Sequence, residues 1–266
     1  MIFKVAAIQM VSGPDVTDNL AHAARLIQDA VRQGASLVAL PEYFCLMGMA
    51  DTDKVGVREE PGRGPIQEFL SKTAAEHGIW LIGGTVPLTC EDAARVRNSL
   101  LVYDDKGRCV VRYDKIHLFG FDNGIEAYRE ANTIEAGDAP QAVQTPYGRV
   151  GLSICYDLRF PELYRKLLPL EMIAVPSAFT TTTGQAHWET LVRARAVENL
   201  AFVIAPAQGG HHPNGRRTHG HSMIVDPWGR VLNVLPQGEG VVMADIDLNY
   251  QKRVRESLPA LEHRVI

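Results

Sequence analysis

Short apolar strands alternate with amphipathic helices along this 266-residue chain, and this alternation is what most limits the folds open to it. The pattern predicts helices over 66–77, 161–168, 185–199 and from an N-cap at Thr17 or Asp18 to about residue 33. The predicted strands cover 3–9, 36–40, 79–83, 98–104, 109–113, 149–154, 172–175, 201–205, 220–225, 231–234 and 240–245. Residues 105–107 read as the turn of a hairpin. Such alternation, with antiparallel hairpins mixed in, predicts a mixed-sheet α/β protein whose helices cover the sheets.

Composition excludes several other classes of protein. Residues 1–266 are predicted to form one domain, because no linker rich in Pro, Gly or Ser divides them. A net charge of -4 favours neither nucleic acid nor an anionic membrane as a partner. The N-terminus lacks the pattern of a signal peptide, and no apolar run approaches the roughly 20 residues that span a bilayer. Four irregularly spaced cysteines, at positions 45, 90, 109 and 155, favour reduced thiols in a cytosolic protein.

One of these cysteines lies at a junction between two kinds of structure. The apolar segment 149–154 predicts a buried strand, and Pro161 suits the first position of the helix that follows. Cys155 would therefore lie near the unpaired N–H groups and the positive end of a helix. This setting is expected to lower the pKa of the thiol and to supply donors for an oxyanion. We interpret Cys155 as a nucleophile, whereas a packing cysteine would more naturally lie inside the strand.

Two further polar residues share the context of Cys155, since each lies at or near the end of a predicted strand in apolar surroundings. They are Glu42 and Lys115. A carboxylate can take the proton of a thiol and return it to a leaving group, and a cation can stabilise the negative charge of a tetrahedral intermediate. The three residues are thus chemically complete for attack on a carbonyl or nitrile carbon. Each alone also has a structural interpretation, as a solvated charge or a packing residue.

Three sequence blocks carry a family resemblance: LPEY (40–43), YDKIHL (113–118) and ICYDLRFPEL (154–163). In this order they resemble the signature blocks of the nitrilase superfamily of carbon–nitrogen hydrolases, and the likeness extends over nearly the whole chain. The resemblance implies a four-layer α-β-β-α sandwich with two mixed β-sheets. It also implies a homodimer or a higher homo-oligomer.

The resemblance assigns roles to individual residues. It implies that Glu42 is the general base, Lys115 the catalytic lysine and Cys155 the nucleophile. A second glutamate, placed in a loop between lysine and nucleophile, matches Glu130, with Glu126 as the alternative. The oxyanion is expected between the lysine and the backbone N–H of Tyr156, and His117 is expected to support the site through packing and hydrogen bonds.

Within the superfamily, the C-terminal half looks most like the small amidase branch that includes deaminated glutathione amidase and ω-amidase. The stretches that carry this likeness are 177–189, 205–212, 220–229 and 258–264. The branch implies an amide substrate with a 2-oxoglutarate-like acyl group. Hydrolysis of deaminated glutathione, for example, would release 2-oxoglutarate and the dipeptide Cys-Gly. Arg159 could grip a substrate carboxylate with its planar fork, and the predicted loop from Phe179 to Thr183 is expected to line the same pocket.

Several alternatives stay open at this point. The same machinery would serve an ω-amidase acting on 2-oxoglutaramate, an N-carbamoyl amino-acid hydrolase or an aliphatic nitrilase. A non-catalytic binding module could also keep this fold. The four histidines between His211 and His221 invite a metal site, but their spacing favours a solvated loop with a structural His221. The leading hypothesis is a cytosolic thiol amidase that acts on a small molecule and needs no cofactor and no metal.

Overall fold

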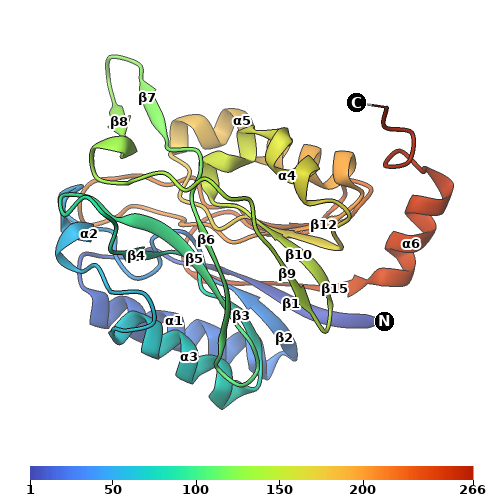
Figure 1. The fold of residues 1–266 in the computed structure, drawn as a ribbon, viewed down its shortest axis with the longest axis horizontal. Helices are drawn as coiled ribbons and strands as arrows, with labels where there is room; N and C mark the ends of the chain where they lie inside the picture. Colours follow the sequence, from blue (N-terminus) through green and yellow to red (C-terminus); the bar gives the residue numbers. More distant parts are fainter. Residues whose placement is uncertain (266) are drawn as a thin grey trace.

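Two β-sheets lie face to face in the computed structural model, which describes residues 1–265 (Figure 1). The first sheet has the order β15-β1-β2-β3-β5-β4, with β6 also paired to β5. Its strands are β1 (Ile2–Gln9), β2 (Ala35–Ala39), β3 (Trp80–Ile82), β4 (Val86–Leu88), β5 (Arg97–Tyr103), β6 (Cys109–Asp114) and β15 (Gly240–Asp247). Strands β1, β2 and β3 are parallel, whereas β15, β5, β4 and β6 pair antiparallel to their neighbours.

The second sheet has the order β14-β13-β12-β11-β10-β9. Its strands are β9 (Ala142–Thr145), β10 (Gly148–Leu152), β11 (Met172–Ala174), β12 (Phe202–Ala205), β13 (Ser222–Val225) and β14 (Val231–Leu235). Only β10, β11 and β12 are parallel to one another. Both sheets are therefore mixed, as the sequence predicts.

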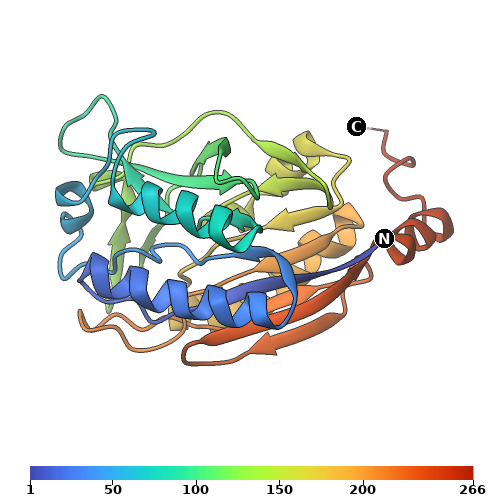
Figure 2. The ribbon, with the colours of Figure 1, turned by 90° about the horizontal axis from the view of Figure 1, so that it is seen from below.

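Helices cover the outer face of each sheet (Figures 1 and 2). Helices α1 (Val16–Arg32) and α3 (Pro65–His77) pack on the first sheet. Helices α4 (Pro161–Leu167) and α5 (Thr181–Asn199) lie over the second. The short helix α2 (Asp53–Gly56) lies in a connection, and α6 (Leu248–Ser257) extends beyond the edge of the sheets. The layer order is α-β-β-α, so the predicted fold class is confirmed.

The alternation along β1 shows how one strand serves two cores. Phe3, Val5 and Ala7 belong to the buried cluster that includes residues of the second sheet, while Ala6 and Ile8 belong to the cluster under α1 and α3. Successive side chains of a strand point to opposite faces, so a strand buried on both faces needs an almost unbroken apolar run. The hydrophobic opening of the chain therefore fixes β1 in the interior of the sandwich.

Three expected elements differ from those observed. Helix α1 is capped by Asp15, whose Oδ1 accepts a hydrogen bond from the N–H of Asp18 at 2.9 Å. Strand β10 ends at Leu152, and Cys155 instead begins a short 3-10 helix, η2 (Cys155–Arg159). Helix α5 begins four residues before the predicted position, because Thr180 caps it. Thr183 therefore lies in the first turn of α5 and not in a loop.

A hairpin lies in the segment 120–139, where the sequence analysis predicts only a loop. Strands β7 (Gly120–Asp122) and β8 (Ala127–Arg129) pair antiparallel and lead into the 3-10 helix η1 (Glu130–Asn132). The side-chain oxygen of Asn123 accepts hydrogen bonds from the N–H groups of Ile125 and Glu126. The pair Asn123-Gly124 is a strong hairpin signal, and it lies in the turn between β7 and β8.

The longest helices contain no membrane-spanning candidate. None of the helices within residues 1–265 is both long and apolar enough to cross a bilayer.

Candidate active site

The polar residues expected to react come from both sheets and meet at one end of the sandwich. Glu42 follows β2 and Lys115 follows β6, both in the first sheet, whereas Cys155 follows β10 in the second. The segment that carries Glu42 passes close to the backbone after β3. Gly84 lies there with a φ of 59°, and a side-chain carbon on it would be 2.3 Å from the carbonyl oxygen of Pro41. Glycine is required at this position because no other residue fits both the dihedral angle and the space.

The backbone of Cys155 is held in an uncommon conformation. Its φ is 48°, in the left-handed region that residues other than glycine rarely adopt, and its N–H donates to the carbonyl oxygen of Pro176 at 2.9 Å. Strained backbone of this kind persists where the surroundings over-determine it, and it is concentrated at functional sites. The side chain is buried, at 8% exposure.

Three charged side chains form what we call the acid–lysine cluster: Glu42, Lys115 and Glu130. The Nζ of Lys115 lies 2.8 Å from Oε1 of Glu42 and 2.8 Å from Oε2 of Glu130. The side chains of Lys115 and Glu42 are 0% and 1% exposed, and that of Glu130 is 12% exposed. Glu42 and Cys155 also line the same small cavity. The structure thus brings together all four residues expected to be catalytic, and Glu130 rather than Glu126 reaches the lysine.

Neighbouring groups hold the two carboxylates in place. The amide Nδ2 of Asn98 donates to Oε1 of Glu42 at 3.0 Å. The hydroxyl of Tyr43 donates to Oε1 of Glu130 at 3.0 Å, and the N–H of Phe119 donates to its Oε2 at 2.8 Å. These partners hold both carboxylates in place through hydrogen bonds that the carboxylate oxygens accept.

The titration of the cluster follows from its burial and its net charge. Burial raises the pKa of Glu42, and Lys115 opposes this only in part. Burial by itself would raise the pKa of Glu130 too, but Lys115 lowers it below its ordinary value. The two carboxylates likewise raise the pKa of Lys115 well above its usual range, against the effect of burial. The cluster therefore combines one lysine cation with two carboxyl groups, so it carries one net negative charge when both carboxyl groups are ionised.

The expectation of a lowered thiol pKa is wrong. Burial, followed by the charge of Glu42, raises the pKa of Cys155 well above its usual value, and Lys115 only partly compensates. A thiolate formed without loss of charge elsewhere would add a second net negative charge to a buried cluster. The thiol can therefore ionise readily only when its proton passes to Glu42.

A second polar cluster, which we call the Asp157 cluster, contains Tyr113, His117 and Asp157. Oδ1 of Asp157 accepts hydrogen bonds from the backbone N–H and from Nδ1 of His117, at 3.0 and 2.7 Å. Oδ2 accepts from the hydroxyl of Tyr113 at 2.7 Å and from the N–H of Ile154 at 2.8 Å. The ring of His117 stacks on Phe160, with centroids 3.7 Å apart. His117 thus makes the packing and hydrogen-bond contacts expected of a supporting residue.

The residues expected to bind substrate line a small cavity at the thiol. Arg159, Phe179 and Thr183 all contact this cavity, together with Cys155 and Tyr156. The guanidinium carbon of Arg159 lies 5.6 Å from the ring centroids of both Tyr156 and Phe179. The cavity measures about 10 Å³, room for roughly one water molecule. An acyl group therefore requires half-buried side chains such as Arg159 to move.

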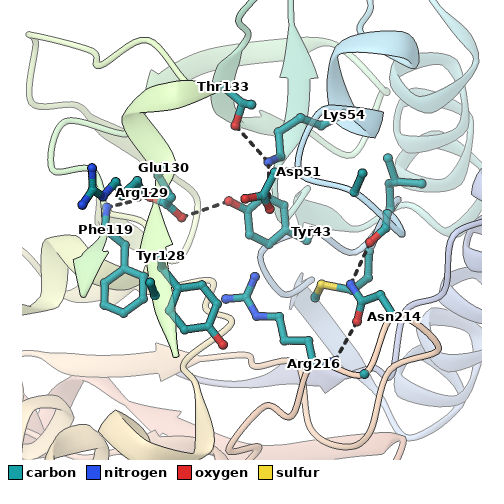
Figure 3. Close-up of a pocket in the computed structure, with 16 residues that line it drawn as sticks. Tyr43, Asp51, Lys54, Phe119, Tyr128, Arg129, Glu130, Thr133, Asn214 and Arg216 are labelled. Carbon is teal, nitrogen blue, oxygen red and sulfur yellow. Dashed lines mark hydrogen bonds and ion pairs between the residues drawn. The ribbon is translucent and has the colours of Figure 1, made fainter. Parts of the chain in front are cut away.

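A larger cavity of about 350 Å³ adjoins the small one, and we call it the outer cavity (Figure 3). Phe119, Glu130 and Arg216 line both cavities, whereas Cys155 lines only the small one. A reaction of the Cys155 thiol would therefore take place at the small cavity, in spite of its size.

The histidine-rich stretch has partners of its own. Nδ1 of His212 lies 2.8 Å from the carbonyl oxygen of Ser12, and its Nε2 lies 2.8 Å from Oγ1 of Thr218. The rings of His219 and His221 stack with centroids 4.1 Å apart. Among residues 1–265, no group of three or more His, Cys, Asp or Glu side chains is arranged to hold a metal ion.

Four residues of this region were missed in the sequence analysis. They are Asn98, Tyr43, Asp157 and Arg216, which bind the carboxylates, fix the turn around Cys155 or line the cavities. Asp157 carried a signal, since it lies two residues after the nucleophile within a quoted motif. Asn98 and Arg216 carried none, because their contacts join segments that are distant along the chain.

Comparison with known families gives the class of this protein. The sequence model described as carbon–nitrogen hydrolase matches residues 4–256. The chain therefore belongs to the carbon–nitrogen hydrolase family, the nitrilase superfamily that its three sequence blocks resemble.

Relatives within the family are amidases. A deaminated glutathione amidase of Synechocystis is 41% identical over 270 residues, which cover 99% of this chain and 98% of the relative. One from Yersinia enterocolitica is 38% identical, with 98% and 92% covered. The omega-amidase NIT2 of Xenopus tropicalis is 38% identical over 98% of this chain and 95% of the relative. The chain is thus an enzyme of the amidase class.

Solved structures agree with the fold. The C. elegans NitFhit protein superimposes with a TM-score of 0.89 at 38% identity, covering 99% of this chain and 65% of that longer one. Saccharomyces cerevisiae Nit3, a member of branch 10 of the nitrilase superfamily, gives a TM-score of 0.88 at 30% identity, with 97% and 94% covered.

Proposed function

We propose that this enzyme hydrolyses the amide bond of deaminated glutathione, or of a closely similar 2-oxo acid amide, through a thioester on Cys155. The observation that carries the proposal is that one buried carboxylate, Glu42, binds the ammonium of Lys115 at 2.8 Å and lines the same small cavity as the thiol of Cys155. The names of the relatives supply the substrate class.

The first half of the reaction forms the acyl-enzyme. Glu42 takes the thiol proton as the sulfur attacks the amide carbon, so the cluster keeps its net charge while the nucleophile forms. The negative charge moves to the amide oxygen, where Lys115 and the backbone N–H of Tyr156 stabilise it. Glu42 then gives its proton to the departing nitrogen, and the C–N bond breaks to leave a thioester.

The second half hydrolyses the thioester. Glu42, again a carboxylate, takes a proton from a water molecule that attacks the thioester carbon. Glu130 helps to position this water, since it lines the cavity and is itself fixed by Lys115. Collapse of the second tetrahedral intermediate releases the acid, and the proton returns from Glu42 to the sulfur of Cys155.

The acyl half of the substrate is assigned to the side of the cavity lined by Arg159, Phe179 and Thr183. Arg159 has no carboxylate partner among the described residues, and its two terminal nitrogens each lie 3.3 Å from Nδ1 of His187. A guanidinium of this kind suits a bidentate contact with the carboxylate of a 2-oxo acid.

The proposal extends to the whole protein. We propose that residues 1–266 form one domain. The structure describes residues 1–265 of it. Val197 and Trp228 are 46% and 60% exposed, which supports a homodimer that covers them. Cys45, Cys90, Cys109 and Cys155 are all free, which is consistent with a reducing cytoplasm.

A steady-state assay tests the substrate assignment. Release of 2-oxoglutarate is followed from deaminated glutathione and, separately, from 2-oxoglutaramate. We expect the higher kcat/KM for the peptide substrate, and we expect Cys155→Ala to be inactive on both. Cys109→Ala, which changes an exposed thiol, is the matched control and should behave as wild type. Wild-type turnover by the Cys155→Ala variant would refute the mechanism.

The second candidate is an ω-amidase, which the likeness to the Xenopus tropicalis enzyme favours. Preference for 2-oxoglutaramate in the same assay would select it without changing the roles of the acid–lysine cluster. Failure of both substrates would reject the substrate class.

A further inference from the structure

The outer cavity contains a buried lysine that the proposed reaction does not use. Nζ of Lys54 donates to Oγ1 of Thr133 at 3.2 Å, and the nearest carboxylate oxygen, Oδ1 of Asp51, is 3.9 Å away. The side chain of Lys54 is only 15% exposed, whereas that of Asp51 is 82% exposed and solvated. An ammonium has three donors, so Lys54 retains donors for a ligand.

An arginine borders the same cavity from another part of the chain. Arg216 donates from Nη2 to the carbonyl oxygen of Ala178 at 3.1 Å, and its guanidinium carbon lies 5.2 Å from the ring centroid of Tyr128 (Figure 3). Its Nε is buried and has no hydrogen-bond partner within the part of the chain that the structure describes. A buried donor without an acceptor is costly, so this nitrogen favours the arrival of an acceptor.

The charges around the outer cavity are unbalanced toward the positive. Glu130 also lines it, but both of its carboxylate oxygens already bind Lys115. Asp51 is largely in solvent, where its charge is screened. Burial lowers the pKa of Lys54, and a bound anion would counteract this desolvation. The cavity therefore suits an anionic group.

The position of the outer cavity relative to the thiol decides which part of a substrate can enter it. Arg159 and Phe179, assigned to the acyl half, line only the small cavity. Glu130, Phe119 and Arg216 form the boundary between the two cavities. The two halves of an amide leave the scissile bond in opposite directions, so the outer cavity is on the amine side.

We propose that Lys54 and Arg216 form a subsite for a carboxylate on the leaving amine, which makes a small peptide with a free C-terminus the preferred leaving group. The inference rests on the proposed function, since it assumes an amide whose acyl half faces Arg159. A volume of about 350 Å³ is within the range of pockets that hold small organic ligands. The subsite would distinguish a peptide amide from a simple amide that releases ammonia.

Three substrates with one acyl group test the subsite: 2-oxoglutaryl-Cys-Gly, the same compound with a C-terminal carboxamide, and 2-oxoglutaramate. For the wild type we expect kcat/KM to be on the order of tenfold higher with the free carboxylate than with the carboxamide. Lys54→Met should remove most of this preference, mainly through KM, because the contact is equally present in ground and transition states. Lys72→Met, which removes an exposed lysine on α3, should retain it.

A binding measurement distinguishes the loss of the subsite from a general loss of catalysis. The dipeptide Cys-Gly should inhibit the wild type competitively and more strongly than its C-terminal amide. Both Lys54→Met and Arg216→Gln should weaken inhibition by the dipeptide but not inhibition by the amide. Equal rates for carboxylate and carboxamide in the wild type would overturn the subsite while leaving the amidase proposal intact. An equal loss on all three substrates in Lys54→Met would also overturn it. No turnover of any of the three by the wild type would reject the proposed function and the subsite with it.

Discussion

The acid–lysine cluster and the Asp157 cluster each contain a buried carboxylate, Glu42 in the first and Asp157 in the second, yet the contacts of these two carboxylates differ in kind. In the Asp157 cluster, backbone N–H groups and fixed side chains occupy both carboxylate oxygens, so the carboxylate holds Ile154 and His117 in place. In the acid–lysine cluster, Glu42 is bound instead by the amide of Asn98 and the ammonium of Lys115, and it lines the same cavity as the thiol of Cys155. A carboxylate held by two backbone N–H groups positions the chain, whereas one held by side chains next to a thiol can exchange a proton with that thiol. The difference between structural and reactive carboxylates thus lies in their partners and not in their burial.

The largest expected effect is the loss of the nucleophile. Cys155→Ala should lower kcat/KM by about 10,000-fold or more, because no other cysteine of the described residues lines the small cavity. The measurement is turnover of the best amide substrate, with the folded state checked by thermal unfolding. Retention of a tenth of the wild-type rate would contradict the assignment of the reaction to Cys155 and the acid–lysine cluster.

Glu42→Gln should have the next largest effect, a loss of about 1,000-fold in kcat/KM, because the amide cannot accept the thiol proton. The amide oxygen still accepts from Asn98 and Lys115, so thermal unfolding should change little. Activity and stability are measured on the same preparation. A large loss of stability with modest loss of rate would show that Glu42 is structural.

Asp157→Asn should give the opposite pattern. Its amide nitrogen cannot accept the hydrogen bonds that Asp157 accepts, so a buried donor would lose its partner at a cost of about 2 kcal/mol in the free energy of unfolding. Urea unfolding measures this cost, with Asp105→Asn in an exposed turn as the control. The turnover of the folded protein should fall by less than in Glu42→Gln, and a loss of the same size would contradict the comparison.

The smallest expected effect is a shift in the pH profile. Burial raises the pKa of Glu42 above 4.5, and the charge of Glu130 contributes to the rise. The reactive form of Glu42 is the carboxylate, so kcat/KM should fall as the pH drops through this raised pKa. Removing the negative charge in Glu130→Gln lowers the pKa of Glu42, and the acid limb should move to lower pH. Glu76→Gln, an exposed change on α3, should leave the limb in place, whereas movement to higher pH in Glu130→Gln would contradict the charge assignment.

The sequence by itself determined the alternating order of most elements and the positions of Glu42, Lys115 and Cys155, whereas it left the second glutamate open between Glu130 and Glu126 and did not indicate β4 or β9. Period-two and helical patterns indicated most strands and helices to within a few residues, because burial of one or both faces dictates where apolar residues fall. The hairpin of β5 and β6 and the end of α3 at Gly78 follow from local turn chemistry, and both are confirmed. Glu42, Lys115 and Cys155 were found because each lies at a strand end within a family motif, although their catalytic roles remain predictions.

Only the tertiary structure decided how these groups behave. The pKa of the Cys155 thiol rises instead of falling, because the thiol is buried and lies near the negative charge of Glu42. Glu42 and Cys155 are more than a hundred residues apart, so no local pattern reports this effect. The partners Asn98 and Tyr43, and the outer cavity lined by Lys54 and Arg216, likewise join distant parts of the chain. Local patterns report the backbone and the solvent exposure of their own segment, whereas dielectric environment, charge balance and cavity shape depend on which segments meet in space.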